Sequence, residues 1–392
     1  MTTMLSTRRQ FLAAGAALPF AWRAMAQRAA APQWVFLGTD KAKGIYRARW
    51  DAATGTMGAV ELAVETERPD FFTMHPVLPV LYSVNAVGAG KGEVSSFRLD
   101  TTSGGLTLLN RASSHGDGPC AVSVNKSGKN AFVANYTGGT VAAYSLDADG
   151  TLRDLSSFDC RNNSVCGALG PVKERQDAAH MHCVTISPSQ RHMLTCNLGE
   201  DALELFQLGN PTDPLANPVR IPVRAGSGPR HVAFHPAKKW VYCIHELDCT
   251  VDLYDWSETG GVASMKLRDA SVVSTLAKGT PLTGNTGCEI FVSRDGRFVY
   301  TCTRGVDEIL VFRVDPATGL LTEQQRVSTG GKIPRYMALD PSGKWLVCCN
   351  QGAAVPNPVG NVTVFAHDAA TGKLSDTPKV FAAETPMFTF FI

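Results

Sequence analysis

Residues 33–51 read QWVFLGTDKAKGIYRARWD, and the same nineteen-residue pattern returns three more times along the 392-residue chain. The other copies span residues 129–147, 239–257 and 297–315. Each copy is a β-rich run, a polar turn and a second β-rich run. Repetition of this kind predicts a repeat architecture, in which neighbouring units share one continuous core.

Two further β-rich runs accompany each copy. One run precedes it and ends in a turn, and another follows it after turns such as Asp315–Gly319 and Asp368–Gly372. The unit is therefore a four-stranded antiparallel meander of roughly fifty residues, which is typical of a β-propeller blade. Helical periodicity is nearly absent, so we predict an all-β protein.

The chain ends supply the last blade. Six blades are marked by turns that follow their first strands, near Pro76, Lys126, Pro188, Pro236, Arg294 and Pro341. The copy at residue 33 lacks a first strand, and residues 384–391 have a first-strand pattern with no second strand after it. We therefore predict a seven-bladed β-propeller over residues 27–392, whose C-terminal strand joins the N-terminal blade. This closure removes two exposed sheet edges.

The first 26 residues have the pattern of a twin-arginine signal peptide. Ser6–Leu12 carries the arginine pair, an apolar run to Trp22 follows, and Ala24-Met25-Ala26 offers a cleavage site. A membrane anchor or a chance Arg-Arg pair is the competing interpretation. We expect the twin-arginine export machinery to be a partner and the mature protein to be periplasmic, without stable membrane insertion.

Composition narrows the possible partners. The net charge is +2, and charged residues make up 18% of the chain. No basic stripe with interleaved aromatic residues is present, which argues against nucleic acid as a partner. The eleven cysteines are odd in number and include no Cys-x-x-Cys. We interpret Cys196, Cys302 and Cys349 as small buried apolar residues. Cys160 and Cys166 share a loop and could pair in an oxidising compartment.

Aligning the repeats predicts a polar rim at one end of the central channel. In a meander, the start of strand one and the end of strand two lie on the same face of the disc. The starts of strand one are Asp70, Cys120, His182, Arg230, Cys288, Arg335 and Met387. The ends of strand two are Thr39, Asn85, Asn135, Asn197, His245, Thr303 and Asn350, and Glu246 and Arg304 follow two of them. Asn and Thr here also fit ordinary turn chemistry.

The arginines of this rim do not fit turn chemistry. Arg230, Arg304 and Arg335 around one channel mouth would repel one another, and Glu246 can balance only one of them. The surplus charge predicts a bound anion, because guanidinium groups hold carboxylate or phosphate through paired hydrogen bonds. His180 and His182 alone make a weak metal pair, and no cofactor-binding motif is present. We therefore expect neither a metal nor a cofactor.

Several short motifs resemble those of the seven-bladed β-propeller lactonases. They are Gln176–His182, Asn197–Asp201, Gly228–His231, His245–Leu247 and Thr303–Gly305. That family contains bacterial 6-phosphogluconolactonases and fungal 3-carboxy-cis,cis-muconate lactonizing enzymes. The resemblance implies a catalytic set of His182, Arg230, Glu246 and Arg304. His245, Thr303 and Ala179 depart from the family pattern, which puts the substrate in question more than the fold.

The leading hypothesis is hydrolysis of a sugar (aldono) lactone, with the arginines holding an anionic group of the substrate, so the expected partner is a small-molecule lactone or anionic sugar acid. Arg230 and Arg304 would stabilise the oxyanion, and Glu246 or His182 would take a proton from water. We assign substrate binding to Arg335, His180, Asn135 and Asn350. The alternatives are reversible lactonization of an unsaturated dicarboxylic acid and a non-catalytic propeller that binds a ligand or a protein. Convergence of the rim groups on one point would favour catalysis.

Overall fold

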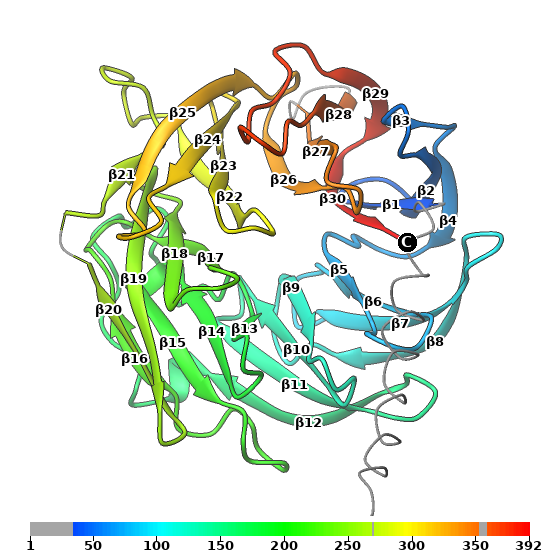
Figure 1. Cartoon of the computed structure of the whole chain (residues 1–392). Coiled ribbons are helices and arrows are strands. Elements are labelled where there is room, and N and C mark those ends of the chain that lie inside the picture. Colours follow the sequence, from blue (N-terminus) through cyan, green and yellow to red (C-terminus); the bar gives the residue numbers. More distant parts are fainter. Residues whose placement is uncertain (1–33, 269, 353–358) are drawn as a thin grey trace, which may run out of the picture.

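The computed structural model describes residues 34–268, 270–352 and 359–392, and these form seven antiparallel sheets arranged around a central axis (Figure 1). The predicted signal segment, residues 1–26, lies outside the described residues. No helix in the described ranges combines the length and the apolar character needed to cross a bilayer. The prediction of a seven-bladed all-β propeller is confirmed.

Each blade is a four-stranded meander, and the blades are numbered here in chain order. Blade 1 contains β30 (Pro386–Phe391), β1 (Trp34–Thr39), β2 (Gly44–Asp51) and β4 (Glu61–Glu65), with the short β3 (Thr56–Met57) beside β2. Blade 2 contains β5 (Phe72–Met74), β6 (Val80–Asn85), β7 (Glu93–Asp100) and β8 (Gly105–Ser113). Blade 3 contains β9 (Pro119–Val124), β10 (Asn130–Asn135), β11 (Thr140–Leu146) and β12 (Leu152–Asp159). Blade 4 contains β13 (Thr185–Ile186), β14 (His192–Asn197), β15 (Ala202–Gln207) and β16 (Val219–Pro222).

The remaining three blades follow the same order. Blade 5 contains β17 (Pro229–Phe234), β18 (Trp240–His245), β19 (Thr250–Thr259) and β20 (Val262–Leu267), with β21 (Val273–Ser274) also paired to β19. Blade 6 contains β22 (Thr286–Val292), β23 (Phe298–Arg304), β24 (Glu308–Val314) and β25 (Leu321–Ser328). Blade 7 contains β26 (Pro334–Leu339), β27 (Trp345–Asn350), β28 (Val359–Ala366) and β29 (Lys379–Glu384). The nineteen-residue repeat thus forms the two middle strands of its blade.

The ring closes through the two ends of the described chain. Strand β30 pairs antiparallel with β1, from Val35 opposite Phe391 to Thr39 opposite Pro386. The Phe388 ring of β30 also packs edge-on against Phe72 of blade 2, with 4.9 Å between ring centroids. The C-terminal strand therefore supplies the first strand of blade 1, as the sequence predicts.

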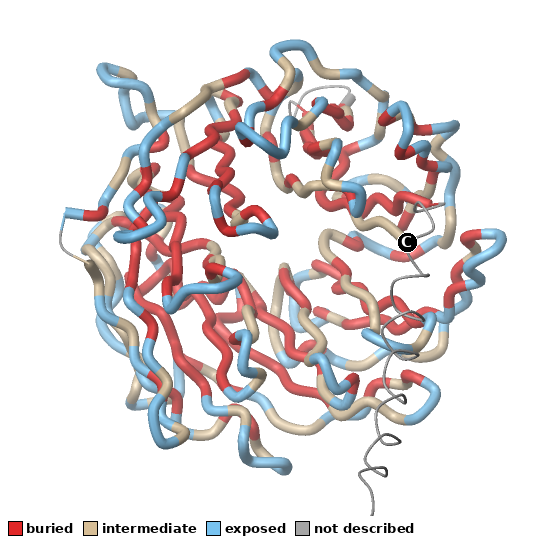
Figure 2. Tube along the Cα trace, in the orientation of Figure 1, coloured by how far each residue is buried: buried red, intermediate tan, exposed pale blue. Residues whose placement is uncertain are grey.

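Hydrophobic clusters between neighbouring blades form the core. Each of the seven clusters joins two adjacent sheets, and the buried residues concentrate in the inner strands (Figure 2). A repeated turn adds to this packing. Gly319, at the turn before β25, adopts a positive φ of 76° and packs against the Trp240 ring of the preceding blade. A side chain there would overlap the indole, and Tyr242 donates a hydrogen bond to the Gly319 carbonyl at 2.8 Å.

The cysteines divide into two groups. Cys160 and Cys166 form a disulfide with a Cα–Cα distance of 5.6 Å, so the pairing left open by the sequence is present. The remaining nine are free thiols, and all but Cys120 are buried. Cys196, Cys302 and Cys349 lie in strands with no exposed surface, which confirms their interpretation as small core residues.

Candidate active site

The first strands of the blades surround the centre of the ring (Figure 1). Residues at and near the starts of these strands line a cavity of about 390 Å³. It receives side chains from blades 1 to 7. Five arginines line it against three carboxyl groups, which leaves the cavity with an excess of positive charge. These charged residues are Arg68, Arg175, Arg230, Arg304, Arg335, Asp70, Glu246 and Glu289.

Glu246 is the centre of the charged network. It follows β18, whereas Arg230 lies at the start of β17 and Arg304 at the end of β23. Oε2 of Glu246 lies 3.1 Å from Nε of Arg230 and 2.9 Å from Nη2 of Arg304. The antiparallel meander thus brings the predicted rim residues onto one carboxylate from two neighbouring blades.

Arg175 completes this network and was missed by the sequence analysis. It lies in the loop before β13, and its guanidinium forms an ion pair with Oε1 of Glu246. The same guanidinium donates a hydrogen bond to the Tyr136 hydroxyl at 3.2 Å. Glu246 therefore meets three arginines, one through Oε1 and two through Oε2.

The arginines decide the charge of Glu246. Only 2% of Glu246 is exposed, and burial alone would raise the pKa of its carboxyl group. Arg304 and Arg230, together with the other basic groups around it, instead hold this pKa well below its usual range. Glu246 is therefore an ionised carboxylate and a poor proton acceptor near neutral pH. Its ion pairs hold the guanidinium groups of Arg175, Arg230 and Arg304 around one carboxylate.

His182 lies beside this network as a neutral base. Its backbone N–H donates to the Cys196 carbonyl at 2.8 Å, which ties it to β14. Its Nε2 lies 3.9 Å from Oε2 of Glu246, and its buried Nδ1 has no hydrogen-bond partner among the described residues. Burial and the charge of Arg230 lower the pKa of His182 well below its ordinary value. The imidazole is therefore uncharged near neutral pH.

His180 lies behind the cavity wall. Its ring stacks on Tyr136 at 4.4 Å between centroids, and its Nδ1 lies 2.9 Å from the Tyr136 carbonyl. Tyr136 in turn meets His182 edge-on at 5.3 Å. Tyr136 and His182 line the cavity, whereas His180 does not. The structure therefore places His180 where it can position Tyr136, away from direct contact with a substrate.

Asn135 and Asn350 also lie outside the cavity. Neither residue has exposed surface. The Asn135 amide donates to the Ser114 carbonyl at 2.6 Å, and the Asn350 amide donates to Asn361 at 2.9 Å. Both side chains thus bond to atoms of neighbouring loops and strands and not to residues that line the cavity. Substrate binding was predicted for both residues, but neither of them lines the cavity. Their amides are instead engaged in hydrogen bonds with neighbouring protein groups.

Arg335 and Asp70 also line the cavity. No carboxylate of the described residues makes an ion pair with Arg335, and its neighbours Arg304 and Arg230 add to burial in lowering its pKa. Burial raises the pKa of Asp70 to about 7, with Asp40 adding to the effect and Arg68 and Arg335 opposing it. Arg335 thus lines the cavity without an ion-pair partner in the described residues, and its predicted role in substrate binding stays a prediction.

His231 and Glu289 complete the set of histidines and carboxyl groups that line the cavity. Nδ1 of His231 lies 2.8 Å from Oε1 of Glu289, and the His231 ring meets His182 edge-on at 5.1 Å. Hydrogen-bond donors and a neutral base thus surround one space. Such a site can bind an anion, stabilise an oxyanion and move a proton.

The family model of the seven-bladed β-propeller lactonases matches residues 34–391. The chain is 32% identical to the 6-phosphogluconolactonase of Bacillus subtilis (strain 168) over 351 residues, which cover 89% of this chain and 95% of the relative. It is 29% identical to the 6-phosphogluconolactonase of Formosa agariphila, over 91% and 99% of the two chains. The periplasmic gluconolactonase of Pseudomonas aeruginosa superposes with a TM-score of 0.81 at 27% identity, over 92% and 98% of the chains. This protein therefore belongs to the seven-bladed β-propeller lactonase family.

Proposed function

We propose that the protein hydrolyses a sugar lactone in the arginine-lined cavity. The observation that carries this proposal is the convergence of Arg230 and Arg304 on one oxygen of Glu246, with the neutral His182 beside it. The two guanidinium groups are fixed before any ligand arrives. Donors fixed in advance stabilise a developing oxyanion without reorganising during the reaction.

The proposed reaction adds one water molecule to the lactone carbonyl. His182 takes a proton from the attacking water, while Arg230 and Arg304 hold the negative charge that develops on the carbonyl oxygen. The ring C–O bond then breaks, and the protonated His182 returns its proton to the leaving oxygen. The product is the open-chain hydroxy acid. Between the two candidates for the general base, the geometry favours His182, because its Nδ1 has no hydrogen-bond partner in the described residues, whereas arginines hold both oxygens of Glu246.

The substrate proposed is an aldonolactone without a phosphate group. The N-terminal twin-arginine pattern and the periplasmic relative in Pseudomonas aeruginosa support a periplasmic location. Sugar phosphates are mainly cytosolic, so an exported enzyme would meet plain sugar lactones more often. Arg335 would bind the polar or anionic end of the substrate, because no carboxylate of the described chain neutralises it.

The two alternative functions are less well supported. A propeller that only binds a partner needs no convergent proton acceptor, yet His182 lies beside the arginines that could hold an oxyanion. Lactonization of an unsaturated dicarboxylic acid would suit the same arginines. The named relatives are a gluconolactonase and 6-phosphogluconolactonases, which favours sugar lactones.

The test is a pH-stat assay of the mature protein with plain aldonolactones, phosphorylated aldonolactones and aromatic-acid lactones. We expect the fastest acid release from a sugar lactone. Arg304→Ala should lower turnover on the order of a hundredfold, because it removes one oxyanion donor. Arg313→Ala is the matched control, since Arg313 is an exposed arginine on the next strand of the same blade. Full activity in a folded Arg304→Ala protein, or no activity on any lactone, would refute the proposal.

A further inference from the structure

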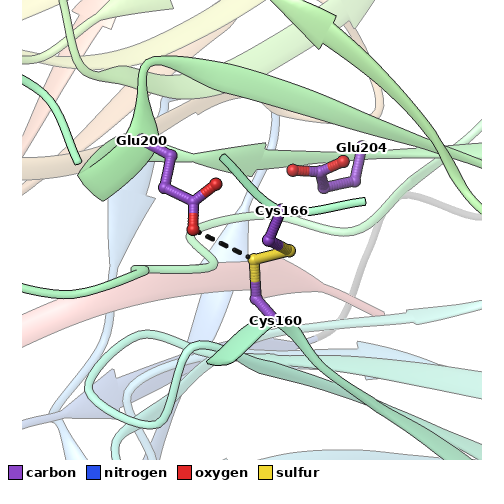
Figure 3. A group of neighbouring side chains, drawn as sticks. All are labelled: Cys160, Cys166, Glu200 and Glu204. Atoms are coloured by element: carbon purple, nitrogen blue, oxygen red, sulfur yellow. Dashed lines mark hydrogen bonds between the residues drawn. A yellow bond between two sulfur atoms is a disulfide. The ribbon is translucent and has the colours of Figure 1, made fainter. Parts of the chain in front are cut away.

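A sulfur–carboxylate cluster, formed by Cys160, Cys166, Glu200 and Glu204, lies between blades 3 and 4, away from the lining of the cavity (Figure 3). In the described part of the chain it is the only group of three or more potential metal ligands. The ligand atoms all lie within 4.8 Å of one another. Cys160 begins a short 3-10 turn after β12, and Glu200 ends another before β15.

Glu204 shows that the cluster is incomplete. Its side chain points toward the two sulfurs (Figure 3), and the residue has no exposed surface. Neither carboxylate oxygen has a hydrogen-bond partner among the described residues. A buried carboxyl group without a partner is costly, so residues of this kind normally meet a cation or a donor. Burial raises the pKa of Glu204 to about 7, which the neighbouring Asn197 opposes only in part.

Glu200 is already oriented as a ligand. Its Oε2 accepts a hydrogen bond from the Gly167 N–H at 2.7 Å, which leaves Oε1 directed at Cys160 Sγ at 3.3 Å. A sulfur in a disulfide carries no proton to share across that distance. Metal-binding carboxylates are commonly held in this way, with one oxygen fixed by a backbone donor.

We propose that this sulfur–carboxylate cluster is a redox-gated Zn²⁺ site. When the disulfide is reduced, two thiolates and two carboxylates surround one cation. When it is oxidised, the sulfurs bond to each other and the site is closed. Two soft sulfur ligands favour Zn²⁺ over Mg²⁺ or Ca²⁺, and a four-coordinate site matches zinc geometry.

Opening requires only local movement. Zn–S bonds of about 2.3 Å and Zn–O bonds of about 2.0–2.2 Å place tetrahedral ligands roughly 3.3–3.8 Å apart. The present spacing of the cluster already approaches this value. Cys166 is only half-buried and lies in an irregular loop, so the opening that we propose moves Cys166 away from Cys160 once the disulfide is reduced.

The gate is a two-electron step. A dithiol reductant transfers two electrons and two protons to the Cys160–Cys166 bond and becomes a disulfide itself. The two protein thiols then lose their protons as Zn²⁺ binds. Reoxidation by a disulfide oxidant removes two electrons from the thiolates, restores the bond and releases the ion. The cluster would therefore hold zinc in reducing surroundings and lose it in oxidising ones.

The test compares zinc binding before and after reduction of the full chain. Purified protein is reduced with a phosphine, freed of reductant under nitrogen and titrated with Zn²⁺ against a chromogenic chelator. We expect reduced protein to bind one more Zn²⁺ per chain than oxidised protein. Cys160→Ser with Cys166→Ser should abolish this increment, and Glu204→Gln should weaken it at least about tenfold. Glu308→Gln, a carboxylate outside the cluster, should leave it unchanged.

Each outcome decides the proposal. If the reduced protein binds no more zinc than the double serine variant, the site does not exist. If binding survives in both cluster variants, other thiols are responsible and the proposal is wrong. Circular dichroism of every variant checks that the propeller is folded. Co²⁺ in place of Zn²⁺ gives a second readout, because two thiolate ligands produce a sulfur-to-cobalt charge-transfer band that the serine variant must lack.

Discussion

Glu246 and Glu204 are two buried glutamates in neighbouring blades with opposite properties. Glu246 meets three arginines, and its pKa is held well below the usual range. Glu204 has no hydrogen-bond partner in the described residues, and burial raises its pKa to about 7. Burial is nearly the same for both, so the partners decide which carboxyl group is charged.

Asp252 shows that position in the blade does not cause the raised pKa of Glu204. Asp252 in β19 occupies the same place as Glu204 in β15, as the third residue of its strand. Arg224 and His245 each lie 3.0 Å from an oxygen of Asp252, and they outweigh burial and lower its pKa. The repeat therefore sets where a carboxylate lies, and the irregular residues around it set what it can do.

The largest effect should follow from Glu246→Gln. Removing the carboxylate leaves buried arginines without their counter-charge, which typically costs about 3–5 kcal/mol of folding stability. The guanidinium groups should also lose their fixed positions, so kcat/KM should fall about 10²–10³-fold. Urea unfolding and the lactone assay measure the two effects. Stability and activity close to those of the wild type would show that the network has no structural or catalytic role.

Glu204→Gln should act in the opposite direction. Because the pKa of Glu204 in the fold is about 7 and its ordinary value is 4.5, ionisation destabilises the fold. This cost is absent below about pH 4.5 and complete above about pH 7. The metal-free variant should therefore be more stable than the wild type at pH 8, by a free energy on the order of 3 kcal/mol.

The control for this prediction is to compare the unfolding free energies of Glu204→Gln and the wild type at acid pH. At pH 4 both proteins carry a neutral group at this position, so their unfolding free energies should coincide. Equal unfolding curves at pH 8 would mean that Glu204 has a compensating partner. The stability changes expected for Glu246→Gln and Glu204→Gln at pH 8 thus have opposite signs.

The fold and the main charged residues of the cavity could be predicted from the sequence, because the register of the repeats determines which strand ends lie on the same face of the propeller. The register placed Arg230, Glu246 and Arg304 together, and the structure confirms their proximity. Arg175 could not be found in this way, since it lies in the loop before β13 and outside the strand ends that the repeat aligns. A charged run directly before His180 was the only available signal.

The aligned ends of strand two also include residues that do not reach the cavity. Asn135 shares its position with His245, yet its amide bonds to turn atoms of its own blade and not to a cavity group. Residue type alone does not separate these roles, because an amide can serve a turn or a ligand equally well. The cluster at Cys160 was also hidden, because its four residues come from two blades and match no Cys-x-x-Cys spacing.

Arg175→Ala removes one of the three arginine partners of Glu246. Arg230 and Arg304 remain, and the Arg175 side chain is 38% exposed, so the folding stability should change by less than about 1 kcal/mol. The Tyr136 hydroxyl loses its guanidinium partner, and kcat/KM should fall about tenfold, or about 1.4 kcal/mol. Lys173→Ala, an exposed cation of the same loop, is the control. Equal activity in the two variants would exclude Arg175 from the site.

Asp70 lies between the two extremes and should give the smallest effect. It has Arg335 and Arg68 as neighbours, but burial still raises its pKa to about 7. Below pH 7 the neutral Asp70 leaves the full charge of Arg335 for an anionic ligand, whereas above pH 7 its carboxylate competes with that ligand. The KM of an anionic lactone should therefore rise a few-fold as the pH passes through 7, and it should rise less at high salt. Asp70→Asn should make this KM independent of pH in that range, and a neutral lactone should show no such rise with either protein. If the KM of the anionic lactone still rises through pH 7 in Asp70→Asn, another group titrates in this range. Asp70 would then resemble Glu246, as a carboxylate that neighbouring arginines keep charged.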